Sequence, residues 1–116
     1  MSRQCTPILT LSVIATAALT ADRFVTAAGA VPAAGASALG VGRSTVAIGA
    51  RQPVDVLGTS VIEAGAAIAA NAFVETDVSG RAITKAAGVT LGRLAPGEVA
   101  TAAGQFVEVL LLPASA

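Results

Sequence analysis

The sequence predicts an all-β fold, a small pseudo-two-fold β-sandwich or barrel, on three observations. The 116 residues include 12 glycines and 5 prolines spread through every segment, which disfavours a helical protein. Short β-prone segments alternate with turn residues along the chain. Sequence blocks also recur in the same order in the two halves, which indicates a duplicated unit. We therefore expect one domain over residues 1–116, built from that unit and preceded by an extended N-terminal arm.

The domain divides into an arm and two copies of the repeat. Residues 1–17 form the arm and the first strand, residues 18–63 the first copy and residues 64–116 the second. The copies match at an offset of about 49 to 53 residues. The matching pairs are Leu19–Val25 with Ile68–Val74, Leu39–Arg43 with Val89–Arg93, and Val54–Leu57 with Val107–Leu110. We expect the halves to share one core whose anchors are Phe24, Phe73, Val54, Val56, Val107 and Val109.

Each copy is expected to form short strands. In the first copy they are residues 24–27 and 38–43, followed by a hairpin of residues 52–57 and 60–63 around Gly58 and Thr59. In the second copy they are residues 73–76, 89–94 and 105–112. The closing strand carries Val107, Val109 and Leu111 on one face. Its other face is apolar towards the end, so we expect it to be covered there.

The apolar stretch Ile8–Ala21 has two interpretations. It spans about 14 residues, which is too short for a membrane-spanning helix. After Arg3 it looks like an export signal that is cleaved at its end. The alternation of Thr10 and Ser12 with apolar neighbours instead predicts a strand. We favour the strand, because Leu19–Ala21 belongs to the first copy of the repeat, and we expect no membrane association.

The composition points to an oligomer or to a protein docked on something larger. Hydrophobic residues make up 54% of the chain and charged residues only 12%, against a usual share of about a quarter. So few charges leave apolar surface on a monomer, and such surface usually marks an interface. The formal net charge is zero and no basic cluster occurs, so we expect no nucleic-acid binding.

Few residues suit catalysis or metal binding. The sequence has no His and one Cys, Cys5, which removes His-based catalysis and sites rich in Cys or His ligands. The glycines of Gly40–Gly42 lack the rest of a nucleotide-binding fingerprint. Glu75 and Asp77 share a strand face, but a solvated turn is the simpler explanation. We expect no enzyme activity, no cofactor and no metal.

Five motifs follow one another along the chain. They are LTxxRFVT at Leu19–Thr26, ALGVGR at Ala38–Arg43, VDVLGT at Val54–Thr59, DxxGRA at Asp77–Ala82 and EVLLLP at Glu108–Pro113. None is diagnostic alone, since each consists of common small residues. Their order resembles the capsid cement, or head decoration, proteins of tailed bacteriophages over nearly the whole chain.

The resemblance implies a non-enzymatic virion protein made in the host cytoplasm. It would bind the outer surface of the capsid, contact the major capsid protein and cement neighbouring subunits. A homotrimer is implied, with a dimer or monomer as alternatives. The candidate capsid or subunit contacts are Arg3, Gln4, Pro7, Ile8, Arg43 and Arg93, the last two at matching repeat positions. The alternative function is a secreted or surface-exposed β-domain that acts in assembly or adhesion, with residues 1–21 as its signal peptide.

Overall fold

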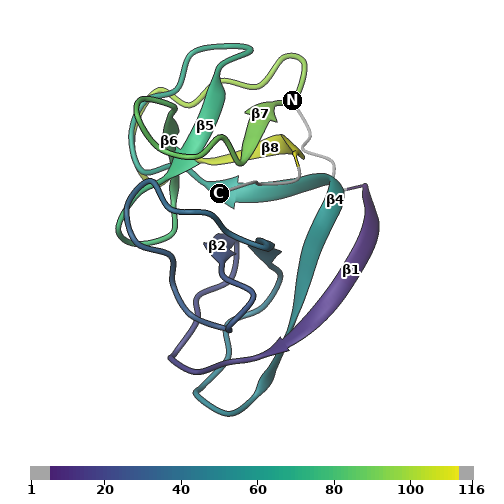
Figure 1. Ribbon diagram of the computed structural model, residues 1–116. Helices are drawn as coiled ribbons and strands as arrows, with labels where there is room; N and C mark the ends of the chain where they lie inside the picture. The colour runs from purple at the N-terminus through teal and green to yellow at the C-terminus, as the bar shows by residue number, and fades with distance from the viewer. Residues whose placement is uncertain (1–5, 113–116) are drawn as a thin grey trace.

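The computed structural model describes residues 6–112, and these form eight strands and no helix (Figure 1). The strands are β1 (Pro7–Ile14), β2 (Arg23–Val25), β3 (Gly40–Gly42), β4 (Arg51–Glu63), β5 (Phe73–Thr76), β6 (Ala82–Thr84), β7 (Gly92–Leu94) and β8 (Phe106–Leu111). They form one sheet of order β2-β3-β4-β8-β7-β5-β6, with β1 also paired to β4. The sheet curves into a nearly closed barrel, which confirms the all-β prediction. Over the described residues, no helix is long and apolar enough to cross a membrane.

The 13-residue strand β4 joins the two halves of the molecule. Asp55 pairs with β1 on one side and with β3 on the other, and residues from Gly58 onwards pair with β8. The expected hairpin around Gly58 is therefore wrong. Gly58 has a φ of +95°, and a Cβ there would overlap the carbonyl oxygen of Thr6. The glycine lets the strand continue close to the start of β1, where a larger residue would not fit.

The interior consists of two apolar clusters. The larger contains Phe24, Val107 and Val109 with residues of both halves, and the smaller contains Val54 with Val13, Ala15, Leu19 and Val25. Of the expected core anchors, Phe24, Val54, Val107 and Val109 are buried. Val56 is half-buried and packs against the smaller cluster.

Phe73 is not a core anchor, which corrects the sequence prediction. It begins β5 and remains 46% exposed, whereas the next residue, Val74, is fully buried in the larger cluster. Successive side chains of a strand point to opposite faces. Because Val74 takes the inward position, Phe73 lies on the outer face.

The closing strand β8 also differs from the prediction on one face. Val107, Val109 and Leu111 are buried, as their shared face implies. On the other face Leu110 remains 44% exposed, so the expected cover over this end is wrong for Leu110. Its neighbours on this face, Thr59 and Arg93, lie on β4 and β7 in the same sheet, so they flank the leucine and do not cover it.

The two halves share several features of backbone geometry. The amide of Leu39 donates to the carbonyl of Val25 at 2.8 Å, and the amide of Leu91 donates to that of Val74 at 2.9 Å. The other matched features are the bridges Leu19–Val46 and Ile68–Ala100 and the positive φ angles of Asp22 (62°) and Asn71 (64°). These pairs support a duplicated unit, which remains our inference.

The matched hydrogen bonds align Leu39–Arg43 with the second copy differently from the sequence comparison. They set Leu39 against Leu91, so Gly40 corresponds to Gly92. The sequence comparison instead matches Arg43 with Arg93, which is an alignment shifted by two residues. The two arginines therefore do not occupy equivalent positions in the structure, and each must be considered by itself.

Candidate functional site

An apolar groove lies on the outer face of the second half. Phe73 of β5 is opposite Arg93 of β7, Arg93 is opposite Leu110 of β8, and Leu110 is opposite Thr59 of β4. Directly opposed residues of antiparallel strands share a face, so these four side chains form a row across the sheet, which we call the outer row. The groove has a volume of about 310 Å³ and is lined by Thr59, Asn71, Arg93, Leu94, Ala95, Pro96 and Leu110.

The outer row combines apolar surface with one cation. Phe73 is 46% and Leu110 44% exposed, and the guanidinium carbon of Arg93 lies 5.4 Å from the centroid of the Phe73 ring. This cation–π contact holds the exposed guanidinium over the apolar ring of Phe73. The residues that line the groove contribute no carboxylate. The groove therefore suits a protein partner that offers an apolar side chain beside an acidic group.

A second, charged groove of about 200 Å³ is lined by Asp22, Arg43, Asp55, Ser60 and Val61. The carboxylate of Asp55 is fully buried and accepts hydrogen bonds from the hydroxyls of Thr10 at 3.1 Å and Ser60 at 2.8 Å. The Nε atom of Arg43 lies 3.6 Å from Oδ1 of Asp55. Arg43 thus pairs with a carboxylate, and about half of its side chain stays exposed.

Asp22 lies in the same charged groove with a φ of +62°. Partial burial raises the pKa of its carboxyl, and the negative charges of Glu63 and Asp55 raise it further. The environment therefore penalises the ionised form of Asp22. A partner group with a negative charge would meet the same repulsion in this groove.

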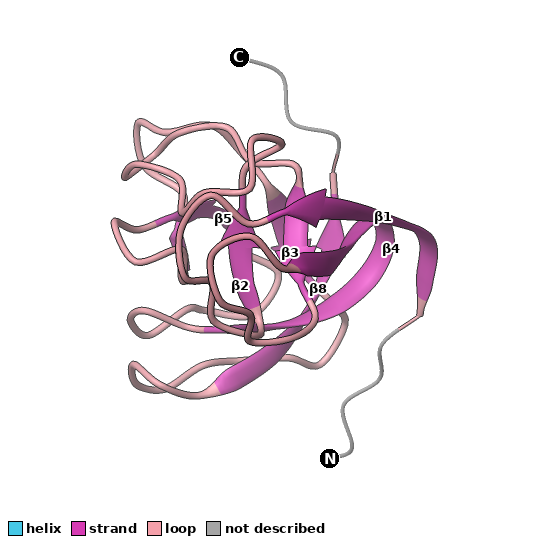
Figure 2. Ribbon diagram, turned by 90° about the horizontal axis from the view of Figure 1, so that it is seen from below, coloured by secondary structure: helices cyan, strands magenta, loops and turns pink. Residues whose placement is uncertain are grey.

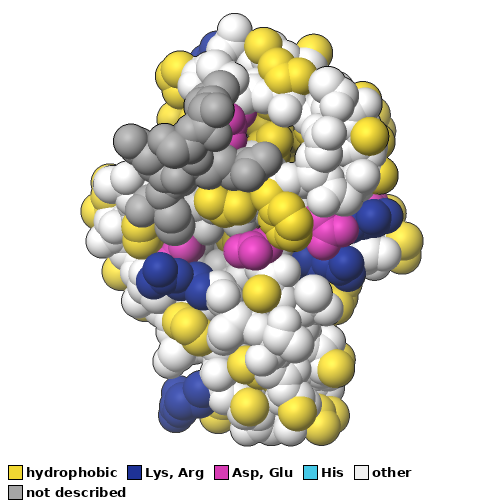
Figure 3. Space-filling model, turned by 180° about the vertical axis from the view of Figure 1, so that it is seen from behind, with side chains coloured by type: hydrophobic (Ala, Val, Ile, Leu, Met, Phe, Trp, Pro, Cys, Tyr) yellow, Lys and Arg dark blue, Asp and Glu magenta, His cyan; other side chains and the backbone are white. Residues whose placement is uncertain are grey.

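Ion pairs link the two halves next to the charged groove. Glu63, at the end of β4, lies 3.2 Å from Arg23 of the first half and 3.7 Å from Arg81 of the second. Arg81 also pairs with Asp77 at 3.2 Å. In Figure 3 most of the charged side chains on this face lie in a belt across its middle. These side chains are engaged with one another, which favours a structural role for them.

The two carboxylates considered for chemistry hold loops in place. Oε1 of Glu75 accepts the amides of Ala86 at 2.7 Å and Gly88 at 2.9 Å, and the side chain is only 7% exposed. Oδ1 of Asp77 accepts the amides of Ser79 and Arg81 in a tight turn. A solvated turn is therefore wrong for Glu75. Over residues 6–112, His, Cys, Asp and Glu form no group of three or more that could hold a metal ion.

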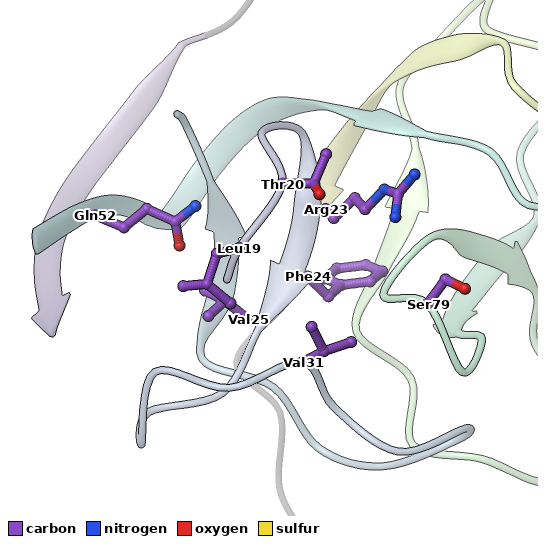
Figure 4. Close-up of a pocket in the computed structure, with 8 residues that line it drawn as sticks. All are labelled: Leu19, Thr20, Arg23, Phe24, Val25, Val31, Gln52 and Ser79. Carbon is purple, nitrogen blue, oxygen red and sulfur yellow. The ribbon is translucent and has the colours of Figure 1, made fainter. Parts of the chain in front are cut away.

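A small cavity, lined mainly by the first half, is too narrow for a ligand. Its volume is about 20 Å³, which holds roughly one water molecule. Figure 4 shows the side chains that line it: Leu19, Thr20, Arg23, Phe24, Val25, Val31, Gln52 and Ser79. The amide nitrogen of the buried Gln52 donates to the carbonyl of Ser44 at 2.6 Å, while its Oε1 has no hydrogen-bond partner among the described residues.

None of the other candidate contacts that the structure describes, Pro7, Ile8 and Arg43, belongs to the outer row. Arg3 and Gln4 are outside the described residues. Pro7 begins β1 opposite Gly58, and Ile8 is 80% exposed. Sequence reasoning selected Arg93 but missed its neighbour Leu110. The apolar outer face of the closing strand was the available indication, and it was attributed to burial.

A sequence model described as phage cement protein matches residues 3–111 of this chain. The chain belongs to the phage cement protein family. It is therefore a virion component with a structural role associated with the capsid, and its family is not one of enzymes. No match is found among the curated proteins.

Among solved structures, the chain resembles the head fiber gp8.5 N base of bacteriophage phi29. The TM-score is 0.72 at 18% identity, over 93% of this chain and 97% of that chain. At this identity the likeness shows a shared fold. The cement family therefore rests on the sequence match, and the barrel is found in another phage head protein.

Proposed function

We propose that the chain binds the outer surface of the phage head, contacts the major capsid protein and cements neighbouring capsid subunits. The observation that carries this proposal is the outer row, in which Phe73 and Leu110 expose apolar surface on either side of Arg93. A capsid-associated protein needs such a docking surface. The groove along the row, of about 310 Å³, can receive a side chain of the shell.

The cementing mechanism is mechanical. Each copy bridges adjacent subunits and so raises the free energy needed to separate them against the pressure of packaged DNA. Weak single contacts add up when one oligomer engages several sites of the lattice. We propose a homotrimer, which presents three outer rows to the shell, with a dimer or monomer as alternatives.

We assign different contacts to the candidate residues. Arg93 contacts the capsid through the outer row, and Arg3 and Gln4 remain candidates from the sequence for the same partner. Arg43 remains a candidate through its exposed half. Pro7 and Ile8 are assigned to contact between copies of the chain.

The geometry favours this function over a secreted domain. Removal of residues 1–21 would delete β1 and would take Val13, Ala15 and Leu19 from the smaller core cluster. Little of that cluster would remain around Val54. The mass of the mature N-terminus distinguishes the two functions, since the secreted domain would begin at Asp22.

The test uses heads that lack the chain, to which purified protein is added back. We expect Arg93→Glu and Leu110→Glu to weaken head binding at least about tenfold, which corresponds to about 1.4 kcal/mol. They should also abolish any rise in the temperature at which heads release DNA. Ile48→Glu is the matched control, because Ile48 is 70% exposed on a loop away from the row.

Two results would contradict the proposal. One is that both variants bind heads as tightly as the unaltered chain while remaining folded. The other is a copy number of only a few per virion, because a cement needs a copy number near that of the major shell protein.

A further inference from the structure

The loop that contains Gly29 meets the end of β1 at the carbonyl oxygen of Ile14. From Ile8 to Val13 the strand leaves one of its edges open. It pairs with β4 along one side, and no other described strand pairs with its second side. Figure 1 shows β1 at the rim of the molecule, and Figure 2 shows it curving along the side away from most of the loops. Ile8, Leu11 and Ile14 are 80%, 43% and 53% exposed. An open, apolar edge strand is a template for pairing with another chain.

The devices that usually block such pairing are scarce in β1. Residues 8–14 contain no charged side chain and no proline, and Pro7 stands only at the start. The register with β4 shifts near Leu9 but is regular from Thr10 to Ile14. The centre of the edge is therefore regularly paired with β4 and uncharged, so a second strand can approach it without like-charge repulsion.

The sequence of β1 is symmetric about Leu11. Two antiparallel copies related by a two-fold axis through Leu11 would pair Thr10 with Ser12 and Leu9 with Val13. Apolar residues then face apolar residues and hydroxyls face hydroxyls, which are the favourable cross-strand pairs. Because β1 matches itself in this way, a second copy of β1 is the partner that this edge favours.

We propose that β1 pairs antiparallel with β1 of a second copy about a two-fold axis at Leu11. Leu11 is opposite Val54, which lies in the smaller core cluster, and Val13 on the same face belongs to that cluster too. The partner's leucine would therefore extend the cluster across the axis and cover exposed apolar surface. On the other face Thr10 keeps its hydrogen bond to Asp55.

This contact is independent of head binding. It makes a dimer of single chains, or it links neighbouring trimers if the three-fold assembly also forms. The purified chain alone is enough to test it, so its failure and the failure of capsid binding are separate results.

The first experiment is cross-linking at the axis. In a Cys5→Ser background, Leu11→Cys places two thiols opposite each other, within the Cα separation of about 4.4–6.8 Å that a disulfide requires. We expect mild oxidation to convert most of the protein to a covalent pair. Ile48→Cys in the same background is the exposed control and should give little product.

The second experiment uses charge at the same position. Leu11→Lys and Leu11→Glu each set like charges opposite each other, so each alone should lose self-association by at least tenfold in sedimentation. Their mixture should restore it, because opposite charges then meet across the axis. Denaturation curves establish that both variants are folded.

Three results would overturn the proposal. They are a chain that stays monomeric at high concentration, an oligomer that gives no more Leu11→Cys product than the control, and an oligomer that Leu11→Lys leaves intact. The second result would assign the self-association to another surface of the chain.

Discussion

The two halves of the barrel put a phenylalanine at corresponding backbone positions and use it differently. The residue after each phenylalanine accepts a matching hydrogen bond, Val25 from Leu39 and Val74 from Leu91. Phe24 is nevertheless buried and Phe73 is 46% exposed. Similar local geometry thus does not determine burial. The surrounding structure decides what each ring contacts.

The difference arises from what lies beside each strand. The amide of Phe24 donates to the carbonyl of Gly80 at 2.7 Å, so the turn of the second half packs against the first. The ring of Phe24 enters the larger cluster, which consists mainly of residues of the second half. On the outer face of β5 the neighbour of Phe73 is the side chain of Arg93. One phenylalanine joins the halves, and we propose that the other contacts the capsid.

The largest effect expected from this comparison is on the two phenylalanines themselves. Phe24→Ala should lower the free energy of unfolding by about 3–5 kcal/mol, because a buried ring leaves a cavity. Phe73→Ala should cost less than about 1 kcal/mol, since it loses exposed area and one cation–π contact. Urea denaturation of both variants measures the difference. Equal losses of unfolding free energy would mean that the two phenylalanines contribute equally to stability.

A second pair tests how closely the strands approach in each half. A Cβ on Gly40 would overlap the carbonyl oxygen of Asp55, whereas one on Gly92 would lie 2.8 Å from that of Leu110. Alanine at either position forces backbone movement, which typically costs about 1–3 kcal/mol. We expect Gly40→Ala to be the more destabilising of the two by chemical denaturation. The reverse order would show that the backbone of the first half moves more easily to accommodate a Cβ.

The smallest effect concerns Asp22 and its counterpart Asn71. Burial raises the pKa of Asp22 above its ordinary value of 3.8, so the folded chain binds more protons than the unfolded chain just above that pH. Stability from this group is present at lower pH and is lost as the pH rises through the raised pKa. Asp22→Asn should therefore raise the Tm at pH 7, by less than about 4 °C, and change little at pH 3.

The reciprocal variant is the control for this prediction. Asn71 has nearly the same positive φ as Asp22, so the backbone at both positions accepts either Asp or Asn. Asn71→Asp should not lower the Tm at pH 7, because the groove that Asn71 lines contains Arg93 and no carboxylate that would repel the new charge. A gain from Asp22→Asn that is the same at both pH values would attribute the effect to the backbone and not to charge.

Much of the strand pattern could be predicted from the sequence. The segment 73–76 agrees with β5, the strands β3, β7 and β8 lie within expected segments, and β2 overlaps the expected segment 24–27. The strand β6 lies outside every expected segment. The hairpin around Gly58 failed because a glycine in a strand and a glycine in a turn look alike locally. Only the pairing of β4 with β1, β3 and β8 distinguishes them.

The candidate site was less predictable. Arg93 was selected through its resemblance to Arg43, but the structure gives the two arginines different surroundings, a phenylalanine ring and a buried carboxylate. Leu110 was expected to be covered because apolar residues usually are. Its exposure depends on which elements pass over β8, and that information is absent from the strand's own residues.

The sequence by itself determined the all-β class, the buried face of β8 and the cement family. These properties depend on local backbone preference, on the two-residue period of a strand and on the order of motifs. All three can be read from neighbouring residues in the sequence. The tertiary structure alone decided that Phe24 is buried while Phe73 is exposed, and that β1 keeps an open edge. Burial depends on what the rest of the chain places against a residue, which no local pattern contains.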